Sequence, residues 1–98
     1  MSSIIEQAIA QKRRLKLYYA GYSRIVEPYA FGLDANGQSL LLCFQFGIQG
    51  NDMRAPNNWG FVHPEQLVSM KLLEESFDRF QSGYIRNHPA FHTVLIQV

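Results

Sequence analysis

The sequence contains few residue types that could carry out covalent chemistry, and their settings do not form a catalytic group. Cys43 is the only cysteine, and it lies in the most apolar run of the chain, where a thiol is expected to be buried and unreactive. His88 and His92 have the four-residue spacing that places two imidazoles on one helical face. Pro89 and the strand-like residues after it argue against a helix, so we predict no metal site.

The acidic residues and the glycines do not indicate a catalytic site either. Glu74, Glu75 and Asp78 follow a predicted strand, and adjacent carboxylates at a strand end are usually solvated. Gly47 and Gly50 lack the following lysine and helix of a phosphate-binding loop. We therefore predict that the protein is not an enzyme and uses no cofactor.

Basic residues form one cluster, for which two interpretations stand. Lys12, Arg13, Arg14 and Lys16 follow a predicted helix. Several cations on a short segment could contact a nucleic-acid backbone. Alternatively, they complement the negative end of the helix dipole.

A long polar connection from 47 to 60 contains two residues that could hold a ligand. Arg54 offers a guanidinium for anions and Trp59 an aromatic face for stacking. The structural alternative is that Trp59 covers the end of the sheet while Arg54 is solvated. Loops of this length are often functional, so both interpretations stay open.

Three consecutive antiparallel strands between residues 14 and 46 are expected to position these groups. Leu15 and Leu17 alternate with polar neighbours, as in a strand with one buried face. Pro28 cannot donate to a ladder, so the second strand is either an edge or carries a bulge. Asn36-Gly37 predicts a tight hairpin, and the apolar run 39–46 predicts a central strand covered on both faces.

The remaining segments are expected to pack on this unit or complete it. A capping box from Ser3 to Glu6 predicts a helix over 3–13, with Ile5, Ala8 and Ile9 on its buried face. Further along, we expect short strands at 61–62 and 70–73, a turn at 63–67, an irregular connection over 77–84, a turn at 87–90 and a last strand over 92–98.

Length and composition indicate one small domain spanning residues 1–98. A hydrophobic content of 47% is enough for a core, which argues against disorder. The formal net charge of +1 gives no overall attraction to nucleic acid or membrane, so any such attraction must be local. No apolar run approaches the roughly 20 residues that span a bilayer. The lone cysteine favours a reducing compartment, and we expect a cytoplasmic protein.

The order of these motifs resembles the WYL domain, the small Sm-like, SH3-type barrel of bacterial regulators. The match covers nearly the whole chain and is best over Tyr19 to Pro28, which includes Gly21 and Arg24-Ile25-Val26-Glu27-Pro28. The tripeptide that names the family falls on Ser39-Leu40-Leu41, where only its leucine is kept. Gln66 stands where many members have arginine, and the chain is more similar to short, stand-alone members. The resemblance implies a mainly β fold: a barrel of about five antiparallel strands with an N-terminal helix.

WYL domains sense ligands, including nucleotides or single-stranded nucleic acid, and pass that binding to a regulatory partner. The resemblance therefore implies that Arg24 contacts an anion and that Tyr18, Tyr22 and Trp59 stack on a base. Arg24 could equally pair with Glu27 or another acid across the sheet, and Tyr18 could be a half-buried sheet residue.

Two functions from different classes are thus expected. One is a regulatory module that binds a nucleotide-like ligand or single-stranded nucleic acid. The other is a non-catalytic assembly module, whose exposed strand edge joins a second copy or a protein partner.

Overall fold

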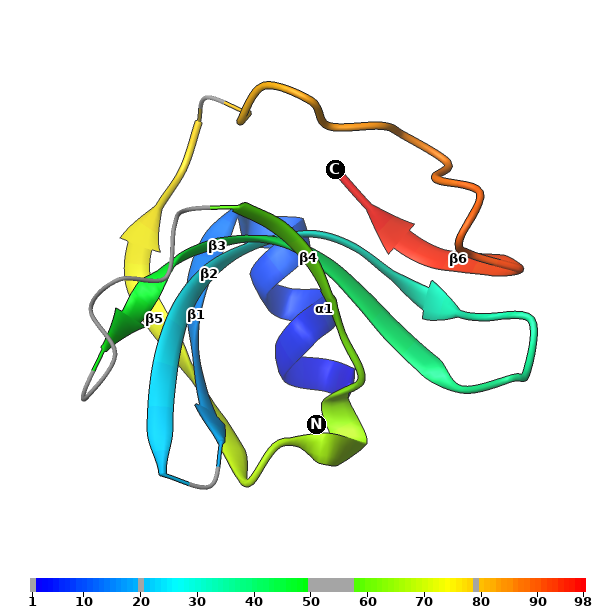
Figure 1. Cartoon of the computed structure of the whole chain (residues 1–98). Helices are drawn as coiled ribbons and strands as arrows, with labels where there is room; N and C mark the ends of the chain where they lie inside the picture. Colours follow the sequence, from blue (N-terminus) through cyan, green and yellow to red (C-terminus); the bar gives the residue numbers. More distant parts are fainter. Residues whose placement is uncertain (1, 20, 50–57, 79) are drawn as a thin grey trace.

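The computed structural model describes residues 2–19, 21–49, 58–78 and 80–98, with the side chains of 2, 3, 22, 47–49 and 58 outside that description. One helix and six strands make up the fold (Figure 1). In chain order they are α1 (Ser2–Gln11), β1 (Arg13–Tyr19), β2 (Tyr22–Leu33), β3 (Ser39–Gln49), β4 (Asn58–Val62), a 3₁₀ turn η1 (Pro64–Gln66), β5 (Ser69–Ser76) and β6 (Thr93–Gln97).

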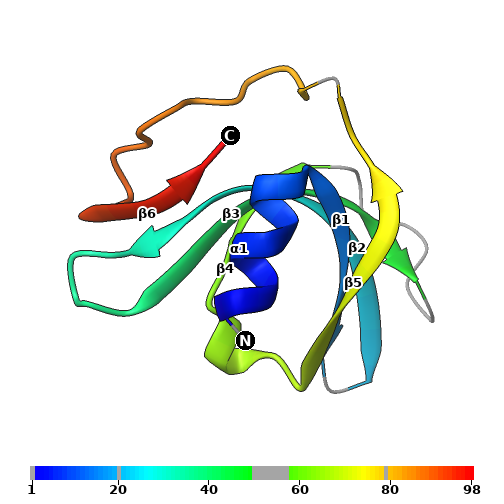
Figure 2. The same cartoon turned by 180° about the vertical axis from the view of Figure 1, so that it is seen from behind.

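The strands form a single antiparallel sheet that curls around α1 (Figures 1 and 2). Its order is β4-β3-β2-β1-β5, and β6 pairs with β2. The mainly β fold and the N-terminal helix are confirmed, whereas the barrel is not. A barrel requires the two end strands to meet. In the described part of the chain, β4 pairs only with β3 and β5 only with β1, so the sheet stays open and has six strands rather than five.

Pro28 marks a bulge in β2, which settles the choice left open by the sequence. Ladder partners on β3 shift register between Pro28 and Ala30. On the opposite side, β1 pairs with β2 as far as Val26, and β6 begins pairing at Ala30. The proline therefore occupies the gap between two different partners, where its missing N–H interrupts neither ladder.

The β2–β3 hairpin turns where the sequence predicts it, but with a different turn. Only Gly37 has the left-handed conformation, at φ +78°, and Asn36 does not. The Asp34 carboxylate accepts hydrogen bonds from the backbone N–H groups of Asn36 and Gln38, both at 2.9 Å. An aspartate turn therefore replaces the two left-handed residues of an Asn-Gly turn.

Helix α1 packs its predicted apolar face on the concave side of the sheet. Ile5 and Ala8 are fully buried and Ile9 nearly so. They meet Leu15, Leu17, Val26, Leu41 and Cys43 in the main core. The helix ends at Gln11, two residues earlier than expected, because Lys12 adopts a left-handed φ of +53°.

The opposite side of the sheet, which we call the outer face, is divided into two regions. At one end, residues 77–78 and 80–92, which we call the segment 77–92, lie between β5 and β6 in the chain and cover the sheet (Figure 1). Its Phe91 joins Ala30, Leu40 and Leu42 in a second core, and its Tyr84 and Ala90 pack against that core. β3 thus contributes Leu41 and Cys43 to one core and Leu40 and Leu42 to the other, so it is covered on both faces there, as the sequence predicts.

Most of the remaining expectations are confirmed, with one correction. The strand at 61–62, the single turn with Pro64 at its start and the final strand are present. The predicted loop from 47 to 60 is wrong at both ends, because β3 continues to Gln49 and β4 begins at Asn58. Trp59 pairs with Phe44 in this ladder, so cross-strand aromatic packing extends the hairpin into the polar stretch.

Candidate functional site

The uncovered region of the outer face carries cations and rings in adjacent rows. In one row Lys16 of β1 lies between Lys71 of β5 and Ile25 of β2, and Phe46 of β3 continues that row beyond Ile25. In the next row Tyr18 pairs with Ser69 and Ser23. The Lys16 ammonium lies 5.6 Å from the centre of the Tyr18 ring. The side chains of Tyr18 and Phe46 are both partly exposed.

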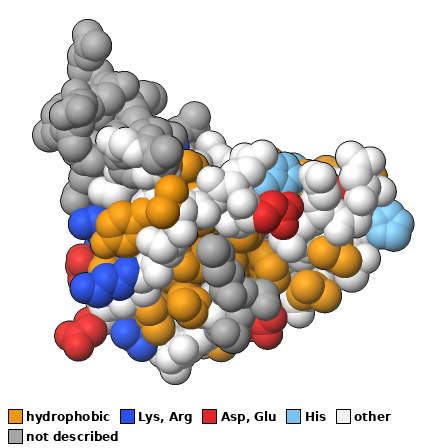
Figure 3. Space-filling view, turned by 90° about the horizontal axis from the view of Figure 1, so that it is seen from below, with side chains coloured by type: hydrophobic (Ala, Val, Ile, Leu, Met, Phe, Trp, Pro, Cys, Tyr) orange, Lys and Arg blue, Asp and Glu red, His pale blue; other side chains and the backbone are white. Residues whose placement is uncertain are grey.

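Figure 3 shows basic and hydrophobic side chains interleaved, with acidic ones among them, along the left side of the molecule, the side of β1 and β5 in Figure 1. We call Lys16, Tyr18, Ile25, Phe46 and Lys71 the outer-face patch. Ladder partners point to the same side of a sheet, so the five side chains form one surface.

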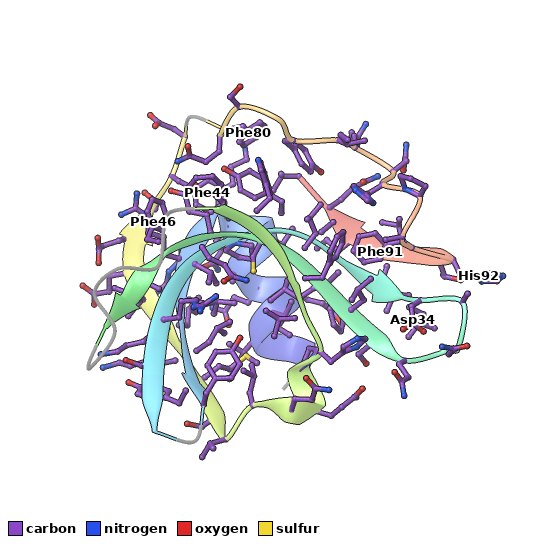
Figure 4. All side chains as sticks on the ribbon, viewed as in Figure 1. Asp34, Phe44, Phe46, Phe80, Phe91 and His92 are labelled. Carbon is purple, nitrogen blue, oxygen red and sulfur yellow. The ribbon has the colours of Figure 1, made fainter. Side chains whose placement is uncertain are left out.

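Arg14 borders this patch and links it to a buried carboxylate. Its guanidinium lies 4.9 Å from the centre of the Phe46 ring, and Phe44 meets Phe46 edge-on at 5.3 Å (Figure 4). Nε and Nη2 of Arg14 both donate to Oε2 of Glu27, at 3.1 and 3.0 Å. Nη1 donates to the exposed carboxylate of Glu75 at 3.2 Å. The cation is therefore paired with two carboxylates and held over the Phe46 ring.

Glu27 is the only buried charged residue of the described chain, and it ties the segment 77–92 to the sheet. Its Oε1 accepts a hydrogen bond from the Tyr29 hydroxyl at 2.9 Å. That hydroxyl oxygen accepts one from the Gln81 backbone N–H at 3.0 Å. Burial raises the pKa of Tyr29 above its ordinary value of 10.0, and the neighbouring carboxylate adds to the rise.

The rest of the basic cluster is dispersed over the molecule. Arg13 donates to the Leu73 carbonyl at 2.8 Å and to the Gln11 side chain at 2.9 Å. The Lys12 ammonium lies 5.6 Å from the centre of the Phe80 ring. None of the four predicted cations lies within the last turn of α1, and Lys12 follows directly after its last residue, Gln11.

Arg24 and Tyr18 project from opposite faces of the sheet. The register pairs Arg24 with Leu17, whose side chain belongs to the main core, and the Arg24 charge acts on the buried Cys43 thiol. Arg24 therefore lies on the concave side, half-buried. Glu27, the acid offered as its alternative partner, bonds to Arg14 instead.

Trp59, the other predicted stacking residue, lies within a cluster of rings. Its ring centre is 4.8 Å from that of Tyr29, 5.4 Å from Phe44 and 5.9 Å from Tyr84. Its indole N–H donates to the Ser82 carbonyl at 2.8 Å. The ring therefore packs between the sheet and the covering segment, and it also lines a cavity. The Tyr22 side chain and Arg54 lie outside the described residues.

Cys43 and the histidines have separate settings. The Cys43 thiol is fully buried, as expected, and burial raises its pKa to about 12. His88 packs edge-on against Phe61 with ring centres 5.0 Å apart. His92 is exposed, with Nδ1 3.3 Å from the Thr93 hydroxyl. Within the described residues, no group of three or more His, Cys, Asp or Glu side chains could hold a metal ion.

Sequence reasoning missed Phe46, Lys71 and the link between Arg14 and Glu27. A signal for Phe46 existed, since Phe44 and Phe46 share one face of a strand by alternation. No local signal exists for Lys71, because it reaches the patch only through the pairing of β5 with β1, whose residues are distant in sequence.

Comparisons with protein-family models, curated proteins and solved structures found no match for this chain. Among the described residues, no helix has the length and apolar character needed to cross a membrane.

Proposed function

We propose that this protein is a non-catalytic regulatory module that binds single-stranded nucleic acid on the outer-face patch. The observation that supports it most is the row in which Lys71, Lys16, Ile25 and Phe46 lie side by side, with Tyr18 in the next row. Bases stack on aromatic rings that stand on an open sheet, while cations contact the phosphates between them. The sequence resemblance to WYL domains supports a regulatory role.

In this proposal the residues of the patch and its surroundings have different roles. Tyr18 and Phe46 supply ring faces, and Lys16 and Lys71 supply charge. Arg14 acts indirectly, because its guanidinium is held by Glu27 and Glu75 and covers part of the Phe46 ring. Arg24 contributes less, since it lies on the concave side with Leu17.

The test is fluorescence anisotropy with a labelled oligothymidylate and, in parallel, a labelled mononucleotide. With two lysines on the patch, the affinity should fall with salt at a log–log slope of about −1.4 for a single strand. Lys71→Ala should reduce that slope by about 0.7. Tyr18→Leu should weaken binding of the oligomer by about 1–3 kcal/mol, the usual loss of one stacked base.

Arg86→Ala is the matched control, because it removes the same charge from an exposed position in the segment 77–92. It should leave the affinity and the salt slope unchanged. No binding of the oligomer at low salt, or equal losses in Lys71→Ala and Arg86→Ala, would contradict the proposal. Tight binding of the mononucleotide alone would point to a nucleotide sensor instead.

A second function, assembly through a strand edge, is supported by β5. This strand pairs along one side with β1, and no other described strand pairs with it. Its outer edge could accept a strand from a second copy. Lys71, Glu74 and Glu75 along β5 are charges of the kind that discourage such pairing. Light scattering decides the homo-oligomeric form: a strictly monomeric protein at high concentration excludes it.

A further inference from the structure

We propose that a second, separate site binds a small planar aromatic or heteroaromatic molecule in the cavity between β4 and the segment 77–92. The cavity has a volume of about 160 Å³. One wall comes from the sheet, with Leu42, Trp59, Gly60 and Phe61. The other comes from the covering segment, with Gly83, Ile85 and His88. It shares no residue with the outer-face patch, so it stands independently of the nucleic-acid proposal.

The size and lining of the cavity select the class of ligand. A dry cavity of about 150 Å³ lined by apolar side chains holds one benzene ring. This cavity is slightly larger, partly open and mostly apolar, so it suits one ring or a compact bicycle. Gly83 leaves room beside Trp59: a Cβ there would lie 3.1 Å from the indole nitrogen, and the residue has a φ of +92°.

The walls are held in place before any ligand arrives. The Trp59 indole is fixed by its bond to the Ser82 carbonyl at 2.8 Å and by stacking on Tyr84 with an interplanar angle of 20°. Phe61 meets the His88 ring edge-on, at 72°. A preformed aromatic site spends little conformational entropy on binding, which favours rigid planar ligands over flexible chains.

His88 adds a hydrogen-bonding group to this mostly apolar site. Its Nδ1 accepts a hydrogen bond from the Ala90 backbone N–H at 3.1 Å. A ring that accepts at Nδ1 carries its proton on Nε2, which makes that nitrogen a donor. Because His88 lines the cavity, a ligand ring with a carbonyl or pyridine-type acceptor offers this donor a partner, whereas a plain hydrocarbon does not.

Trp59 is the only tryptophan of the chain, so its fluorescence reports directly on this cavity. The probes are benzamide and adenine, which are planar and carry acceptors, and cyclohexanecarboxamide, which has the same amide on a puckered ring. We expect saturable quenching and a raised melting temperature with the planar probes, and about tenfold weaker binding of the puckered one. No saturable signal with either planar probe overturns the proposal.

Two variants, at positions of nearly equal exposure, test whether benzamide binds in this cavity. Ile85 and Leu95 are 53% and 54% exposed, and only Ile85 lines the cavity. Ile85→Tyr should weaken benzamide binding about tenfold or more by filling the mouth, and Leu95→Tyr should leave it unchanged. Equal affinity in the two variants overturns the site. Ile85→Ala, which widens the mouth and should also lower the affinity, serves if the tyrosine variant fails to fold.

His88→Phe tests the donor separately. It keeps an aromatic wall and removes Nε2, so benzamide should bind several-fold more weakly while toluene binds as well as before. If benzamide and toluene respond alike, the role assigned to His88 is wrong.

Discussion

Arg14 and Glu27 lie on neighbouring strands with Nη2 and Oε2 3.0 Å apart, although the Arg14 side chain is 30% exposed and that of Glu27 only 2%. The two partners therefore differ in what their loss leaves behind. Without Arg14 a carboxylate stays buried and uncompensated, whereas without Glu27 the guanidinium can still reach water and Glu75.

Arg14→Met should therefore destabilise the protein by about 2–4 kcal/mol. This value is towards the low end of the usual cost of breaking a buried ion pair, because Arg14 is partly hydrated. Glu75→Gln is the matched control, since Glu75 contacts the same guanidinium but its side chain is 62% exposed. It should change the free energy of unfolding by no more than about 0.5 kcal/mol. Urea unfolding measures both, and similar values for the two variants would contradict this account.

Tyr29→Phe should cost about 1–2 kcal/mol at neutral pH, because it removes the hydroxyl between Glu27 and the Gln81 N–H. The same change should flatten the alkaline limb of the stability curve. The folded-state pKa of Tyr29 is raised above 10.0, so on raising the pH the unfolded chain loses this proton first. The stability from Tyr29 is thus complete below pH 10.0 and is lost above it.

Urea titrations at a series of alkaline pH values, run on the wild type and Tyr29→Phe, give the measurement. Their difference isolates Tyr29 from other groups that titrate in this range. A parallel fall in both proteins would show that Tyr29 is not the source.

Cys43 should be almost inert to alkylation in the folded protein. Its pKa is raised from 9.0 to about 12 by burial, so little thiolate forms in the native state. At pH 9.0, iodoacetamide should label the native thiol roughly a hundredfold or more slowly than the same protein in denaturing urea. Mass spectrometry follows the reaction, and comparable rates in the two conditions would mean that the thiol is accessible.

Gly32→Ala should loosen β6 from β2. A Cβ at this position would collide with the Thr93 carbonyl and lie 3.0 Å from the Phe91 ring. We expect a loss of about 1–3 kcal/mol, as for an overpacked core. Amide exchange should accelerate at His92 and Val98, which donate to Leu33 and Tyr29 across this junction.

Gly37→Ala serves as the comparison for this variant. That position has open space around it but a φ of +78°, so its cost should be conformational and confined to the hairpin. If exchange at Val98 accelerates equally in both variants, the steric explanation for Gly32 fails.

The elements with a clear local pattern could be predicted from the sequence. Ile5, Ala8 and Ile9 recur at helical spacing, and Leu15 and Leu17 alternate, so the buried faces of α1 and β1 follow from periodicity. The sequence predicts the turn at Gly37 but not the type of that turn, because the Asp34 side chain competes with the Asn-Gly preference.

The tertiary pairings had no such pattern. The sequence of β2 gives no sign that its first half pairs with β1 and its second half with β6. The barrel was expected from the resemblance alone, and it is absent because β4 and β5, the ends of the described strand order, do not pair with each other. The candidate site depended on the same information: register, not residue type, puts Arg24 on the concave side and brings Lys71 beside Lys16.

The sharing of β2 between β1 and β6 also bears on synthesis at the ribosome. Residues 30–33 cannot complete their hydrogen bonds until residues 93–97 have been made. During that interval the apolar stretch from Ala30 to Leu33 can pair with non-native partners. Its native pairing is also slow, because it requires closing a loop of some sixty residues. A nascent chain stalled before residue 93 should therefore need chaperone protection that the released protein does not.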